Sequence, residues 1–340
     1  MKNRIKTIAS LALTATFSAA LLAGCGGAPS ELSKASPAPA GASPAPAEST
    51  SDAASAKLSV VASFYPVYDF ACKIGGDKVS VRDMVPAGTE PHDWEPAAAD
   101  IVNLEEADVF VYSGAGMEHW VPDVLATLEN KALVSVEASQ GIALRAGHHD
   151  EEEAEPAASG EAAEEESAYD PHVWLAPLNA KIELENIKNA FVQADPDNKD
   201  TYEANYATWS AACDTLDQEY TDTLSGLSKK DLVVSHEAFG YLCDAYGLNQ
   251  MGIEGISPDS EPDPARMAEI QDFVTANNVK VIFSEELVSP KVAEAIASAT
   301  GAEVQTLNPL EGLSDEQLAA GGDYFSVMRQ NLQALKSALE

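Results

Sequence analysis

The sequence predicts an α/β fold of two Rossmann-like lobes, each built around a parallel sheet. Short apolar runs rich in β-branched residues alternate with helical patterns, and this alternation occurs twice, once up to about residue 136 and again after Lys230. Such alternation is typical of parallel βαβ units. A long stretch of helical pattern lies between the two halves.

Residues 1–56 precede the first lobe and carry export signals. Lys2, Arg4 and Lys6 form a basic head, an apolar run follows, and Leu22–Cys25 resembles a bacterial lipobox. The pattern predicts a lipoprotein signal peptide over residues 1–24, and the resemblance implies cleavage before Cys25 and lipid on its thiol. A plain signal peptide with an incidental cysteine is the alternative. Residues 25–56, mostly Ala, Ser, Pro and Gly, predict a disordered tether.

The first lobe is predicted over residues 57–197. Its strands are expected at residues 58–64, 79–85, 108–112 and 133–136, with helical patterns between them. A segment from about 147 to 168 is out of character. It holds His148 and His149, followed by nine acidic residues between Asp150 and Glu166. This composition predicts a solvated loop, which either collects cations as an auxiliary metal loop or is only a charged insertion.

The helical pattern from Asn179 to Leu227 is interrupted at Asp195–Asp197. Its second part, residues 198–227, has no proline and no glycine before Gly226. A helix of this length, about 45 Å at 1.5 Å per residue, can join two lobes rigidly. Two ordinary helices of a single lobe are the alternative. The second lobe is then residues 228–340, with strands at 232–235, 279–283 and 302–307.

Composition limits the function. The formal charge is −35, and removal of Lys2, Arg4 and Lys6 with the signal peptide changes it to −38 (−35 − 3). Such a surface repels nucleic acid and attracts cations. Besides Cys25, only Cys72, Cys213 and Cys243 remain, with no Cys-x-x-Cys spacing. Zinc-thiolate ribbons are therefore excluded, and one disulfide at most can form.

A repeated motif points to a metal. Glu90–Trp94 and Asp170–Trp174 both have the pattern acid-Pro-His-x-Trp, in a chain with six histidines and four tryptophans. Proline favours an extended conformation before it, so each histidine is presented from a loop or strand end. The repetition favours metal ligation by His92 and His172 over packing against tryptophan. His236 directly follows a predicted strand, where open α/β sheets bind ligands.

A zinc hydrolase is an alternative, because three histidines with an open position can activate water. Glu237 and Glu285 are then the candidates for a general base. His236 and Glu237 begin like a zinc-protease helix, but Gly240 stands where a second histidine is required. No nucleophile elbow, P-loop or dinucleotide fingerprint is present, and the chain is not expected to be an enzyme.

Seven motifs, in order from about Lys57 to the C-terminus, resemble those of the metal-binding lipoproteins of ABC importers, in the zinc-binding branch of a group that includes manganese receptors. They are Val61–Pro66, Gly88–Pro96, Asp170–Trp174, Ser235–Tyr241, Ser257–Pro262, Asn308–Leu313 and Asp323–Met328. The resemblance implies two α/β lobes bridged by a long rigid helix, with one metal in the interlobe cleft. A metal-dependent surface adhesin is a further alternative on this fold.

The resemblance also implies the ligands. His92 and His172 match the family's first two ligands, and His236 matches the third, which is glutamate in the manganese-binding relatives. Histidine favours zinc, because manganese prefers oxygen donors. Asn308, Glu285 and Glu311 compete for the fourth position. We predict Glu311 as the ligand, with Asn308 shaping the turn and Glu285 orienting a histidine. The family's mobile loop is matched by residues 147–168, although only two histidines lie there.

The chain is accordingly expected to be an extracytoplasmic Zn²⁺ receptor, a monomer anchored to the cell membrane through lipid on Cys25. It would deliver Zn²⁺ to the permease of an ABC transporter, and so act as the solute-binding protein of zinc ion transport. Because the bridging helix is rigid, we expect small local changes on binding and not wide hinge closure.

Overall fold

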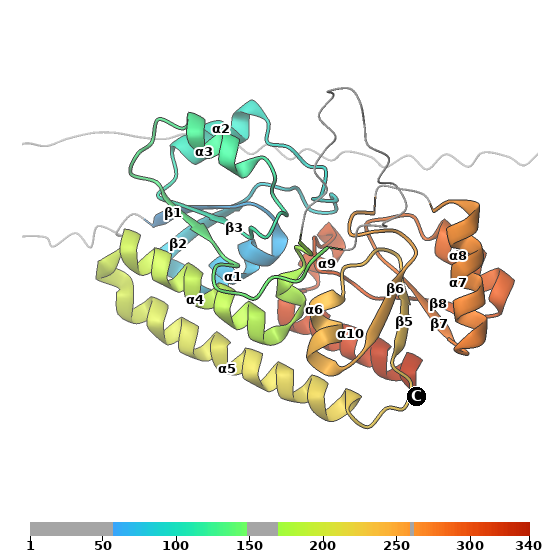
Figure 1. The fold of residues 1–340 in the computed structure, drawn as a ribbon. Helices are drawn as coiled ribbons and strands as arrows, with labels where there is room; N and C mark the ends of the chain where they lie inside the picture. Colours follow the sequence, from blue (N-terminus) through green and yellow to red (C-terminus); the bar gives the residue numbers. More distant parts are fainter. Residues whose placement is uncertain (1–56, 148–168, 259–261) are drawn as a thin grey trace, which may run out of the picture. The chain divides into compact units, whose positions relative to one another are not determined.

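Two four-stranded parallel sheets form the centre of the two lobes (Figure 1). The computed structural model describes residues 57–147, 169–258 and 262–340. The sheets have matching orders, β2-β1-β3-β4 and β6-β5-β7-β8. Their strands are β1 (Leu58–Ala62), β2 (Val79–Asp83), β3 (Val109–Tyr112), β4 (Val134–Glu137), β5 (Asp231–Val234), β6 (Asn249–Gly252), β7 (Val281–Ser284) and β8 (Glu303–Thr306). The predicted pair of parallel α/β lobes is confirmed.

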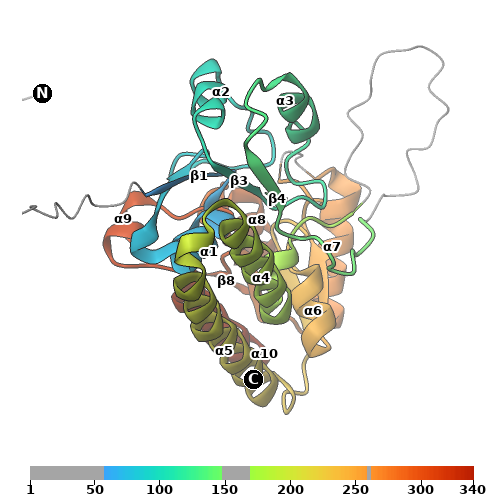
Figure 2. The same cartoon turned by 90° about the vertical axis from the view of Figure 1, so that its left-hand side faces the viewer.

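Helices cover both faces of each sheet. They are α1 (Tyr65–Gly75), α2 (Ala98–Glu105), α3 (Val121–Thr127), α4 (Pro177–Ala194), α5 (Lys199–Leu224), α6 (Gly240–Tyr246), α7 (Pro264–Ala276), α8 (Lys291–Thr300), α9 (Asp315–Ala319) and α10 (Tyr324–Leu339), with the short 3₁₀ helices η1 (Gly76–Lys78), η3 (Val173–Leu175) and η4 (Pro196–Asn198). Figure 2 shows α2 and α3 on one side of the first sheet and α1 and α4 on the other.

One apolar core is shared by the two lobes. It includes Phe70 from α1, Leu184 from α4, Tyr220 from α5, Leu232 from β5 and Leu335 from α10. The opposite faces of the sheets have separate cores, one packed against α2 and α3 and one against α7 and α8. The shared core holds the two lobes together, since separating them would expose large apolar side chains to water.

Helix α5 contacts both lobes along its length. Its 26 residues, about 39 Å at 1.5 Å per residue, contain neither glycine nor proline. Near its start, Asn205 donates to the carbonyl of Ile74. Near its end, the Tyr220 hydroxyl donates to the carbonyl of Met328. The prediction of a bridging helix is confirmed, although this helix is shorter than residues 198–227.

The structure differs from the sequence prediction in the second sheet, where β6 was missed. Its sequence, Asn-Gln-Met-Gly, has no β-branched residue, and it is an edge strand that pairs only with β5. Edge strands bury less surface, so their sequences give a weaker alternating pattern. Register with β5 and not intrinsic propensity places these residues in the sheet.

Several sequence features lie outside the described residues: the signal peptide, Cys25 and the tether within residues 1–56, and His148, His149 and the acidic run within 148–168. Among the described helices, none combines the length and apolar character needed to cross a bilayer. Cys72, Cys213 and Cys243 are free thiols.

Candidate metal centre

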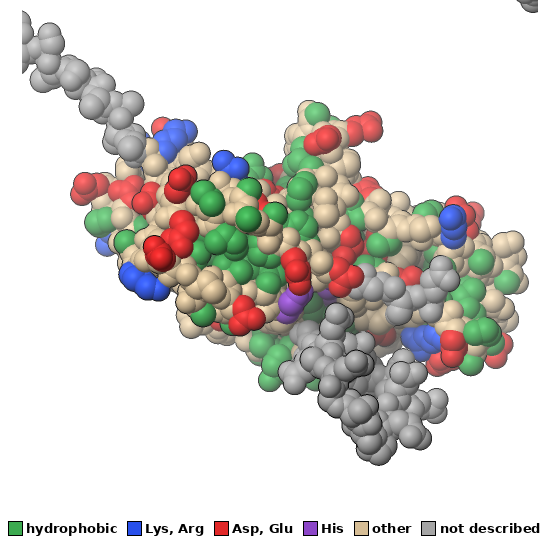
Figure 3. All heavy atoms as spheres, turned by 90° about the horizontal axis from the view of Figure 1, so that it is seen from above, with side chains coloured by type: hydrophobic (Ala, Val, Ile, Leu, Met, Phe, Trp, Pro, Cys, Tyr) green, Lys and Arg blue, Asp and Glu red, His purple; other side chains and the backbone are tan. Residues whose placement is uncertain are grey.

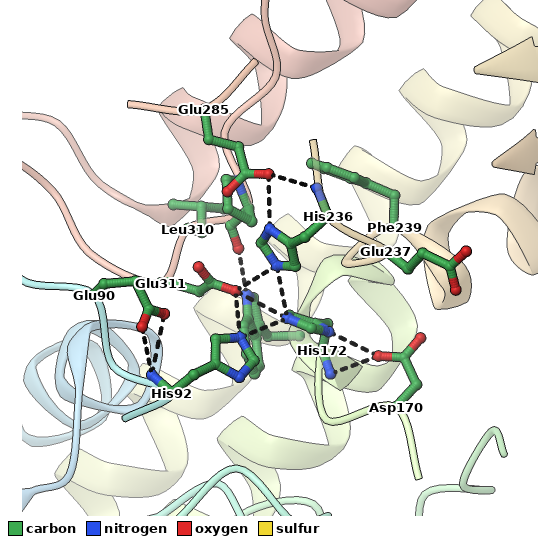
Figure 4. A network of polar contacts seen from close by, with 12 residues as sticks. Glu90, His92, Asp170, His172, His236, Glu237, Phe239, Glu285, Leu310 and Glu311 are labelled. Atoms are coloured by element: carbon green, nitrogen blue, oxygen red, sulfur yellow. Dashed lines mark hydrogen bonds and ion pairs between the residues drawn. The ribbon is translucent and has the colours of Figure 1, made fainter. Parts of the chain in front are cut away.

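Four side chains from distant parts of the chain converge between the two lobes (Figure 4). His92 lies in the loop between β2 and α2, and His172 immediately precedes η3. His236 follows β5, and Glu311 lies between β8 and α9. Carboxyl ends of parallel strands form the crevice where open α/β sheets bind ligands.

The four donor atoms form a compact cage. Glu311 Oε1 lies 3.2, 2.9 and 3.1 Å from the Nε2 atoms of His92, His172 and His236. His172 Nε2 lies 3.3 Å from His92 Nε2 and 3.2 Å from His236 Nε2. All four donor atoms lie within 4.8 Å of one another. A tetrahedral Zn²⁺ ion with bonds of about 2.0–2.1 Å holds its donors roughly 3.3 Å apart. Five of the six separations are thus close to those of a bound ion.

Two of the histidines are oriented by carboxylates. His172 Nδ1 lies 2.8 Å from Asp170 Oδ1, and His236 Nδ1 lies 2.7 Å from Glu285 Oε1. Because an ionised carboxylate only accepts hydrogen bonds, each Nδ1 carries a proton, and each Nε2 presents its lone pair to the centre of the cage when the ring is neutral. The role predicted for Glu285 fits this contact.

His92 is held differently. Its backbone N–H donates to the two carboxylate oxygens of Glu90 at 3.0 and 3.1 Å. Its side chain is 9% exposed, whereas those of His172 and His236 are fully buried. His92 is therefore the outermost member of the cluster.

The charges of the cluster are strongly coupled. Burial alone would raise the pKa of Glu311, but attraction to His236 and hydrogen bonds from the three imidazoles hold it well below its usual range. Burial likewise opposes protonation of His236, yet the attraction of Glu285 and Glu311 raises its pKa well above 6.5. The pKa of His172 is raised against burial by its contacts with Asp170 and Glu311, while burial lowers that of His92.

Asn308 lies near the cluster but is turned away from it. Its Oδ1 accepts from the Leu310 amide at 2.7 Å, and its backbone N–H donates to Asn331 Oδ1. Leu310 has a φ of 62°, in the left-handed region that branched side chains rarely adopt. Asn308 thus stabilises the strained turn that presents Glu311, in keeping with the role predicted for it.

Sequence reasoning missed one residue of this network, Asp170. It was visible as the acid of the second motif, but Glu90, at the same position in the first motif, accepts from the backbone N–H of its histidine, so the motif alone did not distinguish the two roles. Figure 4 also shows the Glu237 carboxylate directed away from the cage. Neither Glu237 nor Glu285, which is bonded to His236, is placed as a general base for a metal-bound water.

Acidic side chains and a cavity lie next to the metal cluster. Figure 3 shows histidine atoms reaching the surface beside Asp and Glu side chains. Glu311 also borders a cavity of about 270 Å³, lined by Tyr65, Tyr68, Asp83 and Leu318 among others. At roughly 30 Å³ per water molecule, the cavity has room for several waters. Glu311 thus borders a cavity, whereas His92 is the member of the cage that reaches the surface.

Comparisons with known proteins find similar zinc-uptake and zinc-binding proteins. The family model described as zinc-uptake complex component A, periplasmic (ZnuA), matches residues 60–338. The high-affinity zinc uptake system protein ZnuA of Bacillus subtilis is 44% identical over 290 residues, which cover 85% of this chain and 90% of that protein. The zinc-binding protein AdcA of Streptococcus pyogenes is 41% identical over 289 residues, which cover 83% of this chain and only 56% of AdcA.

Solved structures share the fold. The Zn(II)-bound ZnuA-like domain of Streptococcus pneumoniae AdcA has a TM-score of 0.71 and 38% identity, covering 84% of this chain and 99% of that one. The metal-dependent lipoprotein YcdH from Bacillus subtilis has a TM-score of 0.72 and 43% identity, with 84% and 100% covered. The laminin binding protein Lmb of Streptococcus agalactiae, described as bifunctional with adhesin and metal transporting activity, has a TM-score of 0.74 and 35% identity, with 84% and 100% covered.

Proposed function

Because this chain belongs to the zinc-uptake complex component A family, we propose that it is an extracytoplasmic receptor that binds Zn²⁺ and delivers it to the permease of an ABC importer. The ligands are His92, His172, His236 and Glu311. The observation that carries the proposal is the cage of three imidazole nitrogens and one carboxylate oxygen, in which five of the six donor separations are close to those around a tetrahedral ion.

The donor set favours zinc over manganese. Three nitrogen donors suit a borderline ion such as Zn²⁺, whereas Mn²⁺ prefers carboxylate and water oxygens. The charges also suit a divalent ion. Glu311 reduces the local charge from +2 to +1, and Asp170 and Glu285 lie one imidazole further out. The positive charge of a buried ion is thereby balanced by one carboxylate inside the cage and by two carboxylates behind the imidazole rings.

Binding and release involve no covalent chemistry. With Glu311 in the fourth position, a substrate has no open coordination site, and the carboxylate of Glu285 is occupied by His236. The shared core and α5 keep the two lobes together, so release depends on movement of loops around the cage. Glu311 is the ligand with space for such movement, since its loop borders the cavity.

The site is tested by measuring metal content after purification without added metal, followed by a competition titration with zinc and manganese. We expect about one Zn²⁺ per chain, with three nitrogen and one or two oxygen neighbours at about 2.0–2.2 Å by X-ray absorption. Equal affinity for manganese would contradict the assignment to zinc. An unaltered affinity after replacement of all four ligands by alanine would place the site elsewhere.

The proposal extends to the ends of the chain. Residues 1–24 act as the signal peptide, Cys25 carries lipid, residues 25–56 form a tether, and the lobes 57–197 and 228–340 act as one monomeric receptor. Cys25→Ser should release the protein from the membrane, because one lipid group with its diacyl chains supplies the membrane affinity. Retention of this variant after a high-salt wash would show another means of attachment.

A further inference from the structure

Five residues, here called the clasp, join the segment before His172 to helix α6 of the second lobe. They are Arg145, Asp170, Gly240, Tyr241 and Asp244. The Arg145 backbone N–H donates to the Tyr241 hydroxyl at 2.9 Å, and this hydroxyl donates to the Asp170 carbonyl at 2.9 Å. Arg145 Nη1 lies 2.8 Å from Asp244 Oδ2. One phenol of the second lobe thus bonds two backbone positions of the first.

Asp170 connects the clasp to the metal centre. Its Oδ1 accepts hydrogen bonds from the backbone N–H and the Nδ1–H of His172, at 3.0 and 2.8 Å. Its Oδ2 faces Arg145 Nε at 3.6 Å. Because Asp170 is only 2% exposed, water contributes little to holding it in place. Its orientation, and with it that of the His172 ring, depends on these protein contacts.

Gly240 is the tightest point of the clasp. A Cβ atom at this position would collide with Asp170 Oδ2 and with Nε and Cδ of Arg145. The close approach of α6 to Asp170 therefore requires glycine. Any other side chain at residue 240 would push the carboxylate or the guanidinium aside.

We propose that the clasp positions His172 and thereby makes zinc affinity depend on contact between the two lobes. This inference rests on the proposed zinc-receptor function. When α6 is seated against Asp170, the carboxylate holds Nδ1–H and the lone pair of His172 Nε2 points into the cage. When α6 moves away, Asp170 loses its restraints and the ring is free to turn. Arg145, Gly240 and Tyr241, none of which is a ligand, then influence the rate of metal release together with the loops around the cage.

The test compares two variants of the clasp with matched controls. Gly240→Ala introduces the collision, and Tyr241→Phe removes only the hydroxyl. Gly255→Ala is the control for the first, since its Cβ would meet nothing within 4 Å. Tyr246→Phe is the control for the second, because this buried tyrosine of the same helix donates to Asp217 on α5 and not to Asp170.

Zinc affinity is measured by chelator competition and zinc release by stopped flow, with the visible spectrum of the Co²⁺-loaded protein as a readout of ligand geometry. Loss of support for a metal-bound histidine typically weakens binding by about 10–100-fold, so we expect at least about tenfold weaker binding and faster release in both clasp variants. Their cobalt spectra should change. The controls should behave like the parent.

Parent-like affinity and spectrum in both clasp variants would overturn the proposal. So would weaker binding with an unchanged cobalt spectrum, since that result would reflect stability and not the orientation of His172. If Gly240→Ala does not fold, Tyr241→Phe decides alone. A parent protein that binds no zinc would refute the proposed function itself, which is a separate outcome.

Discussion

The two copies of the acid-Pro-His-x-Trp motif have the same residue pattern and different surroundings. In residues 170–174 the acid bonds the histidine ring, the histidine is fully buried, and the Trp174 indole donates to the Pro309 carbonyl in the loop that carries Glu311. In residues 90–94 the acid accepts a hydrogen bond from the backbone N–H of His92, and Trp94 is half-buried against Trp120.

This difference shows that the motif determines which groups are presented and that tertiary packing determines how firmly they are held. The second copy lies in the shared core and in contact with the second lobe. The first copy lies in a loop near the surface. We infer that His172 is held more rigidly than His92 before the ion arrives.

The largest effects are expected from removing the histidines themselves. His172→Ala, His236→Ala and His92→Ala should each weaken zinc binding by more than about 100-fold, which is the upper limit for losing a mere supporting partner. His172→Ala should also lower the unfolding free energy of the apo protein by about 1–3 kcal/mol, because Asp170 stays buried without its partner. His92→Ala should leave that stability nearly unchanged.

Chelator competition and urea unfolding of the apo proteins measure these two quantities. Equal stability losses in His172→Ala and His92→Ala would contradict the distinction between the two motif copies.

The next largest effect is expected at Glu311, which contacts both copies through one oxygen atom. Glu311→Ala should weaken zinc binding more than Asn308→Ala or Glu285→Ala, because it removes both a donor and the negative charge inside the cage. Glu311→Gln separates the loss of charge from the loss of the donor, since it removes the negative charge and keeps a neutral oxygen donor. If Glu311→Ala changes neither the X-ray absorption spectrum of the bound zinc nor the zinc affinity, the fourth position belongs to water or to Glu285.

The sequence was sufficient to predict the two lobes and the long helix, and it marked the three histidines as candidates, because each leaves a local pattern. Apolar strands alternate with helices, the helix lacks glycine and proline, and the histidines follow strand ends or prolines. The edge strand β6 has no such pattern, since its place depends on pairing with β5.

The clasp and the different roles of Glu90 and Asp170 were not predictable from sequence either. Arg145 and Tyr241 are 96 residues apart. Gly240 was noted only as the residue that breaks a zinc-protease motif, whereas in the structure it permits α6 to approach Asp170. Contacts of this kind arise from the packing of two lobes and leave no periodic pattern in the chain.

A smaller effect is expected from changing the acids of the two copies to amides. Asp170→Asn should weaken zinc binding by about 10–100-fold, because an amide oxygen is a poorer acceptor for the metal-bound imidazole. Glu90→Gln should cost less than tenfold, since Glu90 bonds a backbone N–H that an amide oxygen also accepts. Equal losses in a chelator competition would show that Glu90 also supports its histidine ring in the bound state.

The smallest expected effect is on the pH dependence of zinc affinity, because the histidines of the two motif copies differ in pKa. In the apo protein the pKa of His172 is raised and that of His92 is lowered, and the pKa of His236 is raised well above 6.5. Groups with raised pKa hold protons that zinc must displace, so apparent affinity should already fall as the pH drops towards 6.5 from above. Each proton displaced costs about tenfold per pH unit. Glu311, with its lowered pKa, stays ionised in this pH range and does not contribute to the pH dependence.

His236→Ala should therefore flatten the pH profile of zinc affinity, whereas His92→Ala should keep the slope of the parent. An NMR titration of the apo imidazoles provides the direct check, and a His92 ring that titrates above His172 would reverse the assignment.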